Sequence, residues 1–350
     1  MTARPEAANL TGRALDPGAG RLLLAADVGN SKTDVALLRS DGTVLAAVRG
    51  PTASHQRVGF DAGVDVLSGL ASSARVIAGM GATSFPVVDV AIVCAAGVDF
   101  PDEERKLARL LERRGLASRV VVRNDTHAAL RAGTDAGWGV TVVCGAGINC
   151  VGRAPDGREI RFPALGEISG DWGGGQALGS AALWASVRAR DGRGPRTVLE
   201  ELVPARFGLR RPIDVTVAIY RGRLLEERLG DLAPDVFAAA ATDAVARAIV
   251  DRLADEVVTM ATATIRRVHL VRRKPPVVLA GSVFRTDDEL FHRRIRDGVA
   301  ARAPGARIIA LDAPPVLGAA LLALDLAGAD AAAATAVRDS LTDARLAHLG

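Results

Sequence analysis

Three short apolar runs open the chain, and turn residues separate them. A glycine-containing turn follows the first run, and Asp41-Gly42 follows the second. Apolar runs of this length joined by such turns predict an antiparallel meander of three strands. The three runs cover residues 22–26, 35–38 and 44–48.

After this meander the pattern alternates between helical spacing and wholly apolar runs. Apolar residues on one side at helical spacing predict helices, and short continuous apolar runs predict strands covered on both faces. The order of the first half is therefore β-β-β-α-β-α-β-α. The predicted helices cover residues 57–78, 102–114 and 125–132, and the predicted strands residues 87–94 and 120–122.

A similar order begins again at residue 139. Each half opens with a strand, a glycine turn, a second strand, a turn and a third strand, so we expect two duplicated α/β domains with a ligand cleft between them. Predicted strands cover residues 139–144, 149–152, 159–162, 276–280 and 307–311, and predicted helices cover residues 176–188, 197–207, 234–268, 287–301, 315–326 and 332–346.

The expected domain boundaries follow from this duplication. Residues 1–20 form a disordered lead-in without the apolar segment of a signal peptide. The first domain covers residues 21–134 and is completed by a C-terminal helix within residues 329–350. The second domain covers residues 135–328 and contains a helical insertion.

Composition narrows the class of protein. Of the 350 residues, 49% are hydrophobic and 24% charged, as in globular proteins. The net charge of +4 is scattered and aromatic residues reach only 3%, which argues against a nucleic-acid partner. No apolar stretch reaches the ~18 residues of a membrane span. We expect a cytoplasmic protein that binds neither membranes nor nucleic acid.

The cysteines and histidines predict no metal centre. Cys94, Cys144 and Cys150 form no CxxC pair and lie in apolar stretches, so we expect buried thiols in a reducing compartment. The five histidines are scattered, without the spacing of a zinc site.

Two glycine turns stand at matching positions, each directly after the first strand of its half. Small residues let backbone amides approach a phosphate, and the first turn adds side-chain donors. Asp27, before the first turn, could hold Mg²⁺ through water. Ordinary hairpin turns are the alternative, since neither turn matches a P-loop or a Rossmann fingerprint. The candidate phosphate contacts are Gly29, Asn30, Ser31, Lys32 and Thr33 in one turn and Gly145, Ala146 and Gly147 in the other.

Three further segments offer polar groups where a strand ends or a helix begins. Asp125 could act as a general base, with a plain helix N-cap as the alternative. The glycine-rich residues 166–175 predict a ligand-approaching loop, in which Asp171 binds a polar ligand or caps the next helix. Gly281 and Ser282 end a strand, where a nucleotide base or ribose could lie, or where an ordinary turn could lead into a helix.

The order of these motifs over residues 22–326 resembles the superfamily of sugar kinases, actin and heat-shock chaperones. Within it, the chain resembles N-acetylglucosamine kinases and the related ATPase activators of benzoyl-CoA reductase. The resemblance implies two actin-like (ribonuclease H-like) α/β domains, ATP between the two phosphate turns, and Asp125 as the catalytic base. The cysteines do not match the cluster pair of the iron–sulfur activators, which favours the kinase branch.

Several positions depart from the pattern of these relatives. Ala146 and Ile148 replace the threonine and serine of the second phosphate turn, and Trp172 replaces an acid in the sugar-side loop. Ser54-His55 stands where relatives have Asn-His. The resemblance places the sugar contacts at Ser54, His55, Gly97, Asn124, Asp125, Asn149, Glu167 and Asp171.

The function expected from the resemblance is ATP- and Mg²⁺-dependent phosphorylation of a sugar hydroxyl by a cytoplasmic homodimer. The first candidate is the 6-hydroxyl of N-acetylglucosamine or a related hexosamine. The alternative is a non-catalytic nucleotide- or sugar-binding regulator, or a plain ATPase, because hydroxyl contacts are missing from the second phosphate turn.

Overall fold

The computed structural model describes residues 20–81 and 87–348. The lead-in expected at residues 1–20 therefore lies almost wholly outside the described residues. The chain divides into two compact units, which are described separately. The first unit comprises Met1–Gly139, Arg153–Glu159 and Leu311–Gly350, and the second comprises Val140–Gly152 and Ile160–Ala310.

The first unit is built on a six-stranded sheet with the order β11-β3-β2-β1-β4-β5. The first three strands form the predicted antiparallel meander, and β4 and β5 extend the sheet parallel to β1. Every residue of β1 is buried, as its continuous apolar sequence predicts. The strands are β1 (Leu22–Val28), β2 (Lys32–Arg39), β3 (Val44–Pro51), β4 (Val88–Ala95), β5 (Ala117–Asn124) and β11 (Ala347–His348).

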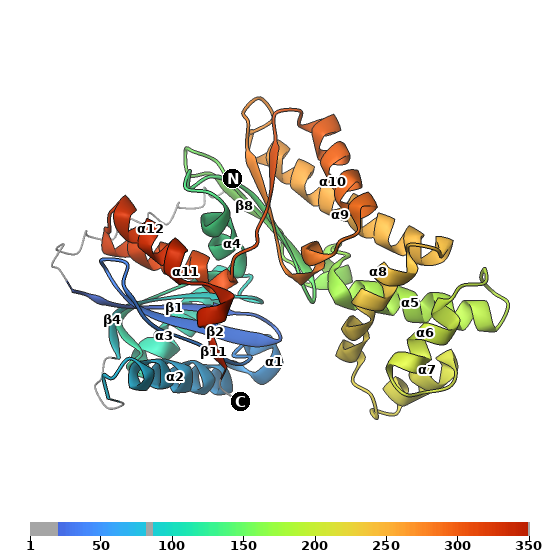
Figure 1. The fold of residues 1–350 in the computed structure, drawn as a ribbon, viewed down its shortest axis with the longest axis horizontal. Coiled ribbons are helices and arrows are strands. Elements are labelled where there is room, and N and C mark those ends of the chain that lie inside the picture. The colour runs from blue at the N-terminus through green and yellow to red at the C-terminus, as the bar shows by residue number, and fades with distance from the viewer. Residues whose placement is uncertain (1–19, 82–86, 349–350) are drawn as a thin grey trace, which may run out of the picture. The chain divides into compact units, whose positions relative to one another are not determined.

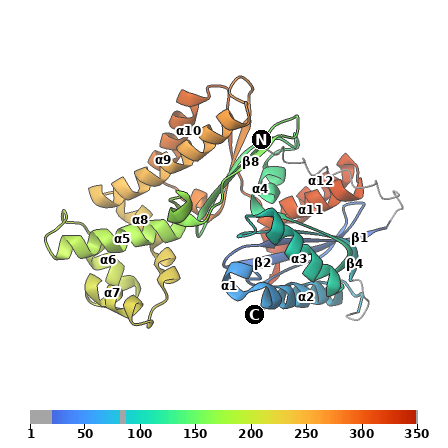
Figure 2. The ribbon, with the colours of Figure 1, turned by 180° about the vertical axis from the view of Figure 1, so that it is seen from behind.

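Helices cover both faces of this sheet, as Figures 1 and 2 show. Alternate residues of β1 enter two different cores, since successive side chains of a strand point to opposite faces. Leu24 packs with α2 (Phe60–Ile77) and α3 (Pro101–Arg113). Leu23 packs with α4 (Asp125–Gly133), α11 (Pro315–Ala327) and α12 (Ala331–Ser340).

The second unit repeats this strand order. Its five-stranded sheet has the order β8-β7-β6-β9-β10. When the strands of each unit are numbered from one to five along the chain, both sheets have the order 3-2-1-4-5, since the first sheet contains β3-β2-β1-β4-β5. The predicted duplication of two α/β units is confirmed. The strands are β6 (Gly139–Cys144), β7 (Ile148–Arg153), β8 (Glu159–Arg161), β9 (Pro276–Ala280) and β10 (Arg307–Ala310).

Helices make up most of the second unit. A short 3-10 helix, η1 (Gly166–Ser169), precedes them, and η3 (Ser282–Arg285) follows β9. The longer helices are α5 (Gly174–Arg190), α6 (Leu199–Arg206), α7 (Pro212–Tyr220), α8 (Ala233–Ala239), α9 (Ala244–Arg267) and α10 (Glu289–Arg302), with η2 (Glu226–Leu232) between α7 and α8.

Two predicted helices are each divided in the structure. The helix expected at residues 57–78 breaks at Gly59, whose φ of 82° is left-handed, so that α1 (His55–Val58) precedes α2. The helix expected at residues 234–268 divides into α8 and α9. Asp243 causes this division, because its carboxylate accepts the Val245 and Ala246 amides as an N-cap.

The C-terminal segment differs most from expectation. Residues 315–326 were assigned to the second domain, but α11 packs on the first sheet and Leu311–Gly350 belongs to the first unit. The final helix ends at Ser340, and η4 (Asp343–Arg345) and β11 follow it, with β11 parallel to β3. The sequence analysis also missed α7, an almost wholly apolar segment of nine residues.

Over the described ranges, every helix is too short or too polar to cross a bilayer.

Candidate functional site

Three parallel strands of the first unit end at one edge of its sheet. The register pairs Val28 of β1 with Ala95 of β4, and Ala95 with Asn124 of β5. This edge therefore gathers Asp27, the loop after β4, and Asp125. Ligands of open α/β sheets bind at the carboxyl ends of the strands, so this edge is the candidate site of the first unit.

The carboxylates of Asp27 and Asp125 are close enough to influence each other. The pKa of Asp27 lies well above its ordinary value, first because the side chain is buried and then because Asp125 and Asp34 add negative charge. Lys32 and Arg49 act in the opposite direction without cancelling these effects. A buried carboxylate surrounded by negative charge is a place where a divalent cation would lower the free energy.

This edge fits Mg²⁺ held by few protein ligands. Among the described residues, no group of three or more histidine, cysteine, aspartate or glutamate side chains is placed to hold a metal. Mg²⁺ does not need such a cage, since it keeps several waters and binds one or two carboxylates together with substrate phosphates. Asp27 offers the oxygen ligand that this mode of binding requires.

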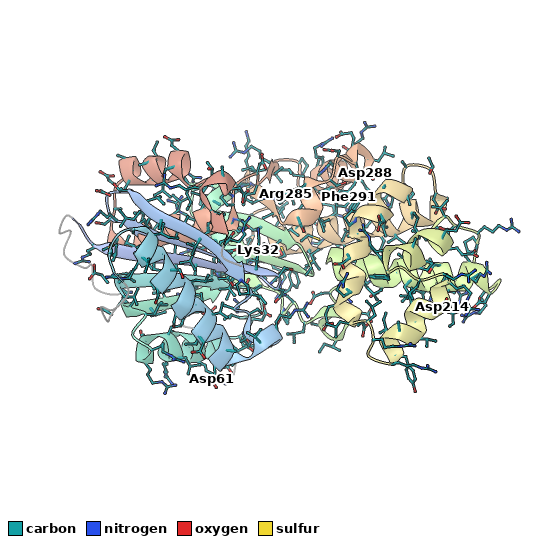
Figure 3. The ribbon with its side chains drawn as sticks, turned by 60° about the horizontal axis from the view of Figure 1, so that its bottom comes forward. Lys32, Asp61, Asp214, Arg285, Asp288 and Phe291 are labelled. Atoms are coloured by element: carbon teal, nitrogen blue, oxygen red, sulfur yellow. The ribbon has the colours of Figure 1, made fainter. Side chains whose placement is uncertain are left out.

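The turn after β1 is fixed by its own hydrogen bonds. The Gly29 amide donates to the Lys32 carbonyl at 2.9 Å, and the Thr52 hydroxyl donates to the Gly29 carbonyl at 2.7 Å. Lys32 is nearly half exposed and is the first residue of β2, where Figure 3 labels it. Thr33 is fully buried, and its Oγ1 accepts the Ala53 amide at 2.8 Å. Thr33 thus holds the turn in place, whereas Lys32 presents its charge at the surface.

The predicted sugar contacts of the first unit lie next to this turn. Ser54 Oγ donates to Asn30 Oδ1 at 2.8 Å, and the Gln56 side-chain amide donates to the Gly97 carbonyl at 3.3 Å. His55 stacks on Phe60 with ring centroids 4.3 Å apart. Its Nδ1 is buried and has no hydrogen-bond partner among the described residues, and its Nε2 lies 3.6 Å from a carboxylate oxygen of Glu103.

Asn124, not Asp125, caps helix α4. Its Oδ1 accepts the Thr126 amide at 3.1 Å and the Thr126 hydroxyl at 2.6 Å. The capping role that was the alternative for Asp125 is therefore filled by its neighbour. The Asn124 side-chain amide also donates to Asp99 at 3.0 Å.

The sequence analysis missed Asp99, which is buried at the same edge of the sheet. Its backbone amide donates to Glu103 Oε2 at 2.9 Å. Its position just beyond the predicted strand at residues 87–94 was the signal that could have found it, because polar side chains at strand ends gather at one edge.

The second unit holds its phosphate turn from two sides. The amides of Gly175 and Gln176, at the start of α5, donate to the carbonyls of Gly145 and Ala146 at 2.8 and 3.0 Å. A side chain at Gly174 would lie 2.5 Å from the Ala146 carbonyl oxygen. These contacts tie residues 145–147 to the glycine-rich loop that precedes α5.

The turn after β9 closes the other side of the phosphate turn. Gly281 has a φ of 108°, and a Cβ there would meet the Cys144 carbonyl oxygen at 2.2 Å. Ser282, the first residue of η3, is exposed. By contrast, Gly145 and Gly147 face open space, so their backbone is approachable. The residues predicted to hold the nucleotide in this unit are thus neighbours.

Asp171 lies in a loop bonded mainly to itself. The Ser169 hydroxyl donates to Asp171 Oδ2 at 2.5 Å, and the Asp171 amide donates to the Gly166 carbonyl at 3.1 Å. Gly173 is the N-cap residue of α5, so Asp171 does not have the capping role that was its alternative. Glu167 is exposed in the same loop. Asn149, on β7, accepts the Cys150 amide at 2.7 Å.

The three cysteines are free and buried, as expected. Burial raises the pKa of Cys144 and of Cys150 to about 12. Burial also raises the pKa of Cys94, and the negative charge of Asp27 adds to this effect. Burial therefore favours the thiol over the nucleophilic thiolate at all three positions.

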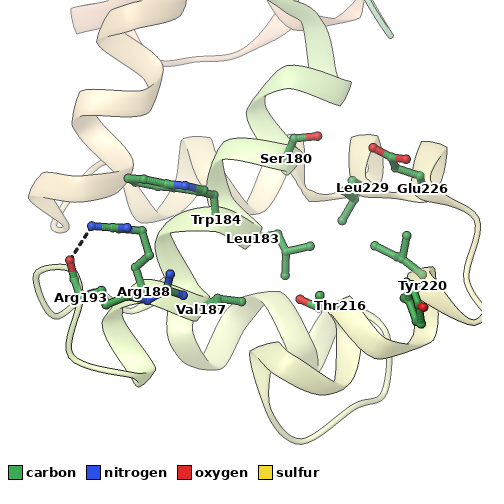
Figure 4. Close-up of a pocket in the computed structure, with 11 residues that line it drawn as sticks. Ser180, Leu183, Trp184, Val187, Arg188, Arg193, Thr216, Tyr220, Glu226 and Leu229 are labelled. Atoms are coloured by element: carbon green, nitrogen blue, oxygen red, sulfur yellow. Dashed lines mark hydrogen bonds between the residues drawn. The ribbon is translucent and has the colours of Figure 1, made fainter.

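A pocket of about 490 Å³ lies among helices α5 and α7 and η2 of the second unit (Figure 4). Its lining is mostly apolar and includes Trp184 and Tyr220, which are 64% and 89% exposed. None of the predicted site residues lines it.

Known proteins resemble this chain over most of its length. The family model for the BadF/BadG/BcrA/BcrD ATPase family matches residues 26–323. The chain is 25% identical over 307 residues to the N-acetylmuramic acid/N-acetylglucosamine kinase of Clostridium acetobutylicum, covering 87% of this chain and 98% of that protein. It is also 25% identical over 317 residues to the N-acetyl-D-glucosamine kinase of Dictyostelium discoideum, with the same two coverages.

A solved structure extends the likeness to the fold. A proposed N-acetylglucosamine kinase of Chromobacterium violaceum superposes with a TM-score of 0.67 at 25% identity, covering 87% of this chain and 99% of that chain. The two-unit α/β architecture is thus shared along nearly the whole length of that protein.

Proposed function

The chain belongs to the BadF/BadG/BcrA/BcrD ATPase family, and we propose that it is a kinase that transfers the γ-phosphoryl group of ATP to a sugar hydroxyl. The first candidate for the acceptor is the 6-hydroxyl of N-acetylglucosamine or a related hexosamine. The observation that carries the proposal is the pair of neighbouring carboxylates, Asp27 and Asp125, at the strand ends of the first unit.

Asp125 is the proposed catalytic base. Asn124 supplies the cap of α4, so the Asp125 carboxylate is not required for that purpose. A carboxylate at this edge can accept the proton of the sugar hydroxyl as the hydroxyl oxygen attacks the γ-phosphorus, while the bond to the leaving ADP oxygen breaks. Such a positioned base contributes about 10²–10⁴-fold to the rate.

Positioning and charge neutralisation supply the rest of the catalysis in phosphoryl transfer. Lys32 can neutralise a phosphate oxygen, and Asp27 is the residue that would hold Mg²⁺. When bound, Mg²⁺ would offset the negative charge of the phosphates. Asp34 is engaged by Arg49 through two hydrogen bonds, so it is placed to set the charge around Asp27 rather than to bind a ligand.

The second unit supplies the proposed nucleotide contacts. Ala146 and Ile148 have no hydroxyl groups, so the backbone amides of Ala146 and Gly147 are the proposed phosphate donors, whereas the Gly145 amide already donates to the Gly147 carbonyl at 2.9 Å. Gly145 and Gly147 leave open space for this approach. Gly281 and Ser282 lie beside the turn, where we place the adenosine.

The sugar contacts are proposed in both units. In the first unit we assign Ser54, His55, Gly97 and Asn124, and the buried Nδ1 of His55 has no hydrogen-bond partner among the described residues. In the second unit we assign Asn149, Glu167 and Asp171. N-acetylglucosamine is the first candidate because two relatives that are 25% identical over 87% of this chain carry that kinase name.

The decisive experiment measures ADP formation with ATP, Mg²⁺ and a panel of hexoses and N-acetylhexosamines. We expect ADP only when the correct sugar is present, and sugar 6-phosphate as the second product. ADP without any sugar would identify a plain ATPase. A sugar-induced rise in melting temperature without ADP would identify a sensor, and either result would overturn the kinase.

Asp125→Asn tests the base. We expect kcat to fall about 10²–10⁴-fold while ATP affinity is nearly unchanged, since the proton acceptor is lost and the nucleotide contacts remain. Asp102→Asn, the same change in the exposed first turn of α3, is the matched control and should retain full activity. Normal turnover by Asp125→Asn would exclude its role.

We also propose that the protein acts as a homodimer, as the resemblance implies. Light scattering during gel filtration measures the mass directly, and a monomer at micromolar concentration would contradict this part of the proposal.

A further inference from the structure

The loop that carries Asp171 is held largely by hydrogen bonds among its own residues, although Asp171 itself is only 8% exposed. Backbone and hydroxyl hydrogen bonds join residues 165–171 to one another, as in the bond from the Leu165 amide to Ser169 Oγ at 2.9 Å. Ile168 is 89% exposed, so the tip of the loop buries almost no apolar surface. A loop built in this way keeps its internal shape but needs an external contact to fix its position.

Arg252 supplies such a contact. Its guanidinium carbon lies 3.9 Å from the ring centroid of Trp172, the residue directly after Asp171. Arg252 belongs to α9, a helix of 24 residues whose inner face is buried in the core of the second unit. The Trp172 ring is therefore attached to one of the most firmly packed elements of that unit.

Two acids near Arg252 on α9 are held by other arginines. Asp251 is paired with Arg247 at 3.6 Å, and Asp255 accepts two hydrogen bonds from Arg294 at 2.7 and 2.8 Å. The acids closest to Arg252 in sequence are thus engaged by other arginines. A guanidinium above an indole ring is the most favourable common form of cation–π contact.

The residues after Trp172 are fixed in a different way. Gly173 packs against Ile148, and Gly175 and Gln176 donate to the phosphate turn through their backbone amides. These bonds need no side chain, so they hold the nucleotide half of the loop independently of Arg252. Trp172 therefore lies between residues 165–171, which are bonded mainly to one another, and residues 173–176, which are fixed to the phosphate turn.

We propose that Trp172 and Arg252 form a positioning pair that fixes Asp171 for the acceptor sugar, without contributing to nucleotide binding. This inference rests on the proposed kinase function and assigns a task to Trp172, which stands where relatives have an acid. In place of the acidic side chain of relatives, the cation–π contact of Trp172 fixes the position of the loop. The sugar is then recognised through Asp171.

Arg252→Gln tests the pair, because it removes the cation and keeps a long polar side chain. An exposed cation–π contact is worth ~0.5–1 kcal/mol, which corresponds to a change of about two- to fivefold. We expect KM for the sugar to rise by that factor, with KM for ATP and the melting temperature unchanged. Arg252→Lys should restore most of the effect, since an ammonium group also lies favourably over an indole ring.

The matched control is Arg188→Gln. Arg188 lies over Trp184, 4.5 Å from the ring centroid, in the helical pocket of Figure 4 and away from the predicted site residues. It makes the same chemical change at a second arginine–tryptophan contact, and we expect no change in either KM. Sugar binding followed by tryptophan fluorescence, without ATP, provides a readout that does not depend on turnover.

The outcomes separate this inference from the proposed function. Absence of sugar-dependent ADP from the wild-type protein would refute the kinase, whatever Arg252 does. An active wild type whose sugar KM is the same in Arg252→Gln would refute the positioning pair alone. Equal increases in both KM values, or a lower melting temperature, would show that Arg252 acts only on stability.

Discussion

Two aspartates near the first phosphate turn are buried, yet we expect opposite effects on stability when each is replaced by asparagine. Asp34 is 1% exposed and accepts two hydrogen bonds from Arg49, at 2.6 and 2.7 Å. Asp27 is buried beside Asp125, and its pKa is raised. One carboxylate is neutralised by a cation, and the other is held next to further negative charge.

Asp34→Asn leaves the Arg49 guanidinium without its main partner. Breaking a buried ion pair costs ~3–5 kcal/mol. Arg49 is 16% exposed and keeps a second contact with Asp343 at 3.1 Å, so the lower end, ~3 kcal/mol, applies. For domains of 150–250 residues, each kcal/mol changes the melting temperature by ~2–4 °C, which gives a decrease of about 6–12 °C.

Asp27→Asn should instead raise the melting temperature at neutral pH. A carboxyl group whose pKa is higher in the folded state contributes stability that is complete below its ordinary pKa of 3.8. That contribution is lost as pH rises through the raised folded value. The carboxyl group is ionised in the unfolded state at neutral pH, so the raised pKa in the folded state makes Asp27 unfavourable for folding there, and its removal should gain ~2–4 °C for each kcal/mol relieved. The same variant should lose Mg²⁺-dependent activity, as expected of a strained functional group.

Calorimetry in EDTA measures both variants without the stabilising effect of bound Mg²⁺, at neutral pH and at a pH below 3.8. The gain of Asp27→Asn should disappear at the lower pH, because the carboxyl is then protonated in both states. A loss for Asp27→Asn as large as that for Asp34→Asn would refute the argument. A gain that persists at low pH would refute it equally.

Two further predictions concern the second unit and the thiols. In Gly145→Ala the new methyl group meets open space, so the melting temperature should be unchanged while KM for ATP rises. Gly174→Ala would place a Cβ 2.5 Å from the Ala146 carbonyl oxygen at a φ of 79°, so it should lower both stability and ATP affinity. Equal thermal stability of the two variants would contradict this prediction. Native protein at pH 8 should not react with a thiol reagent at Cys144 or Cys150, whose pKa is about 12, until denaturant is added; rapid labelling without denaturant would show that these thiols are accessible.

The main course of the fold could be predicted from the sequence because its signals are local. Apolar runs of strand length and turn residues such as Asp41-Gly42 determine the meander, and the same pattern repeats from Gly139 onwards. The division at Gly59 was harder to foresee, since only the left-handed backbone there distinguishes it from a glycine inside a helix. The placement of α11 depends on which of the two sheets buries its apolar surface, and this is decided by tertiary packing and not by the local sequence.

In the candidate site, too, the residues with local sequence signals could be predicted, whereas their tertiary contacts could not. Asp27 and Asp125 were found because each follows an apolar strand, and the structure brings their charges close together. That Asn124 and not Asp125 caps α4 depends on the hydrogen bonds that the Thr126 amide and hydroxyl donate to Asn124, which spacing alone does not reveal. The contact between Arg252 and Trp172 joins residues 80 positions apart and has no signature in the sequence.

The return of the C-terminal segment to the first unit has a consequence for biosynthesis. Strands β1 to β5 leave the ribosome early, but the face that α11 covers stays open until more than 170 further residues have been translated. The second unit, which is nearly continuous in the chain, can fold during that interval, although domains closer to the N-terminus usually fold first. In the nascent chain, the exposed apolar surface of the first sheet is therefore a natural target for chaperones.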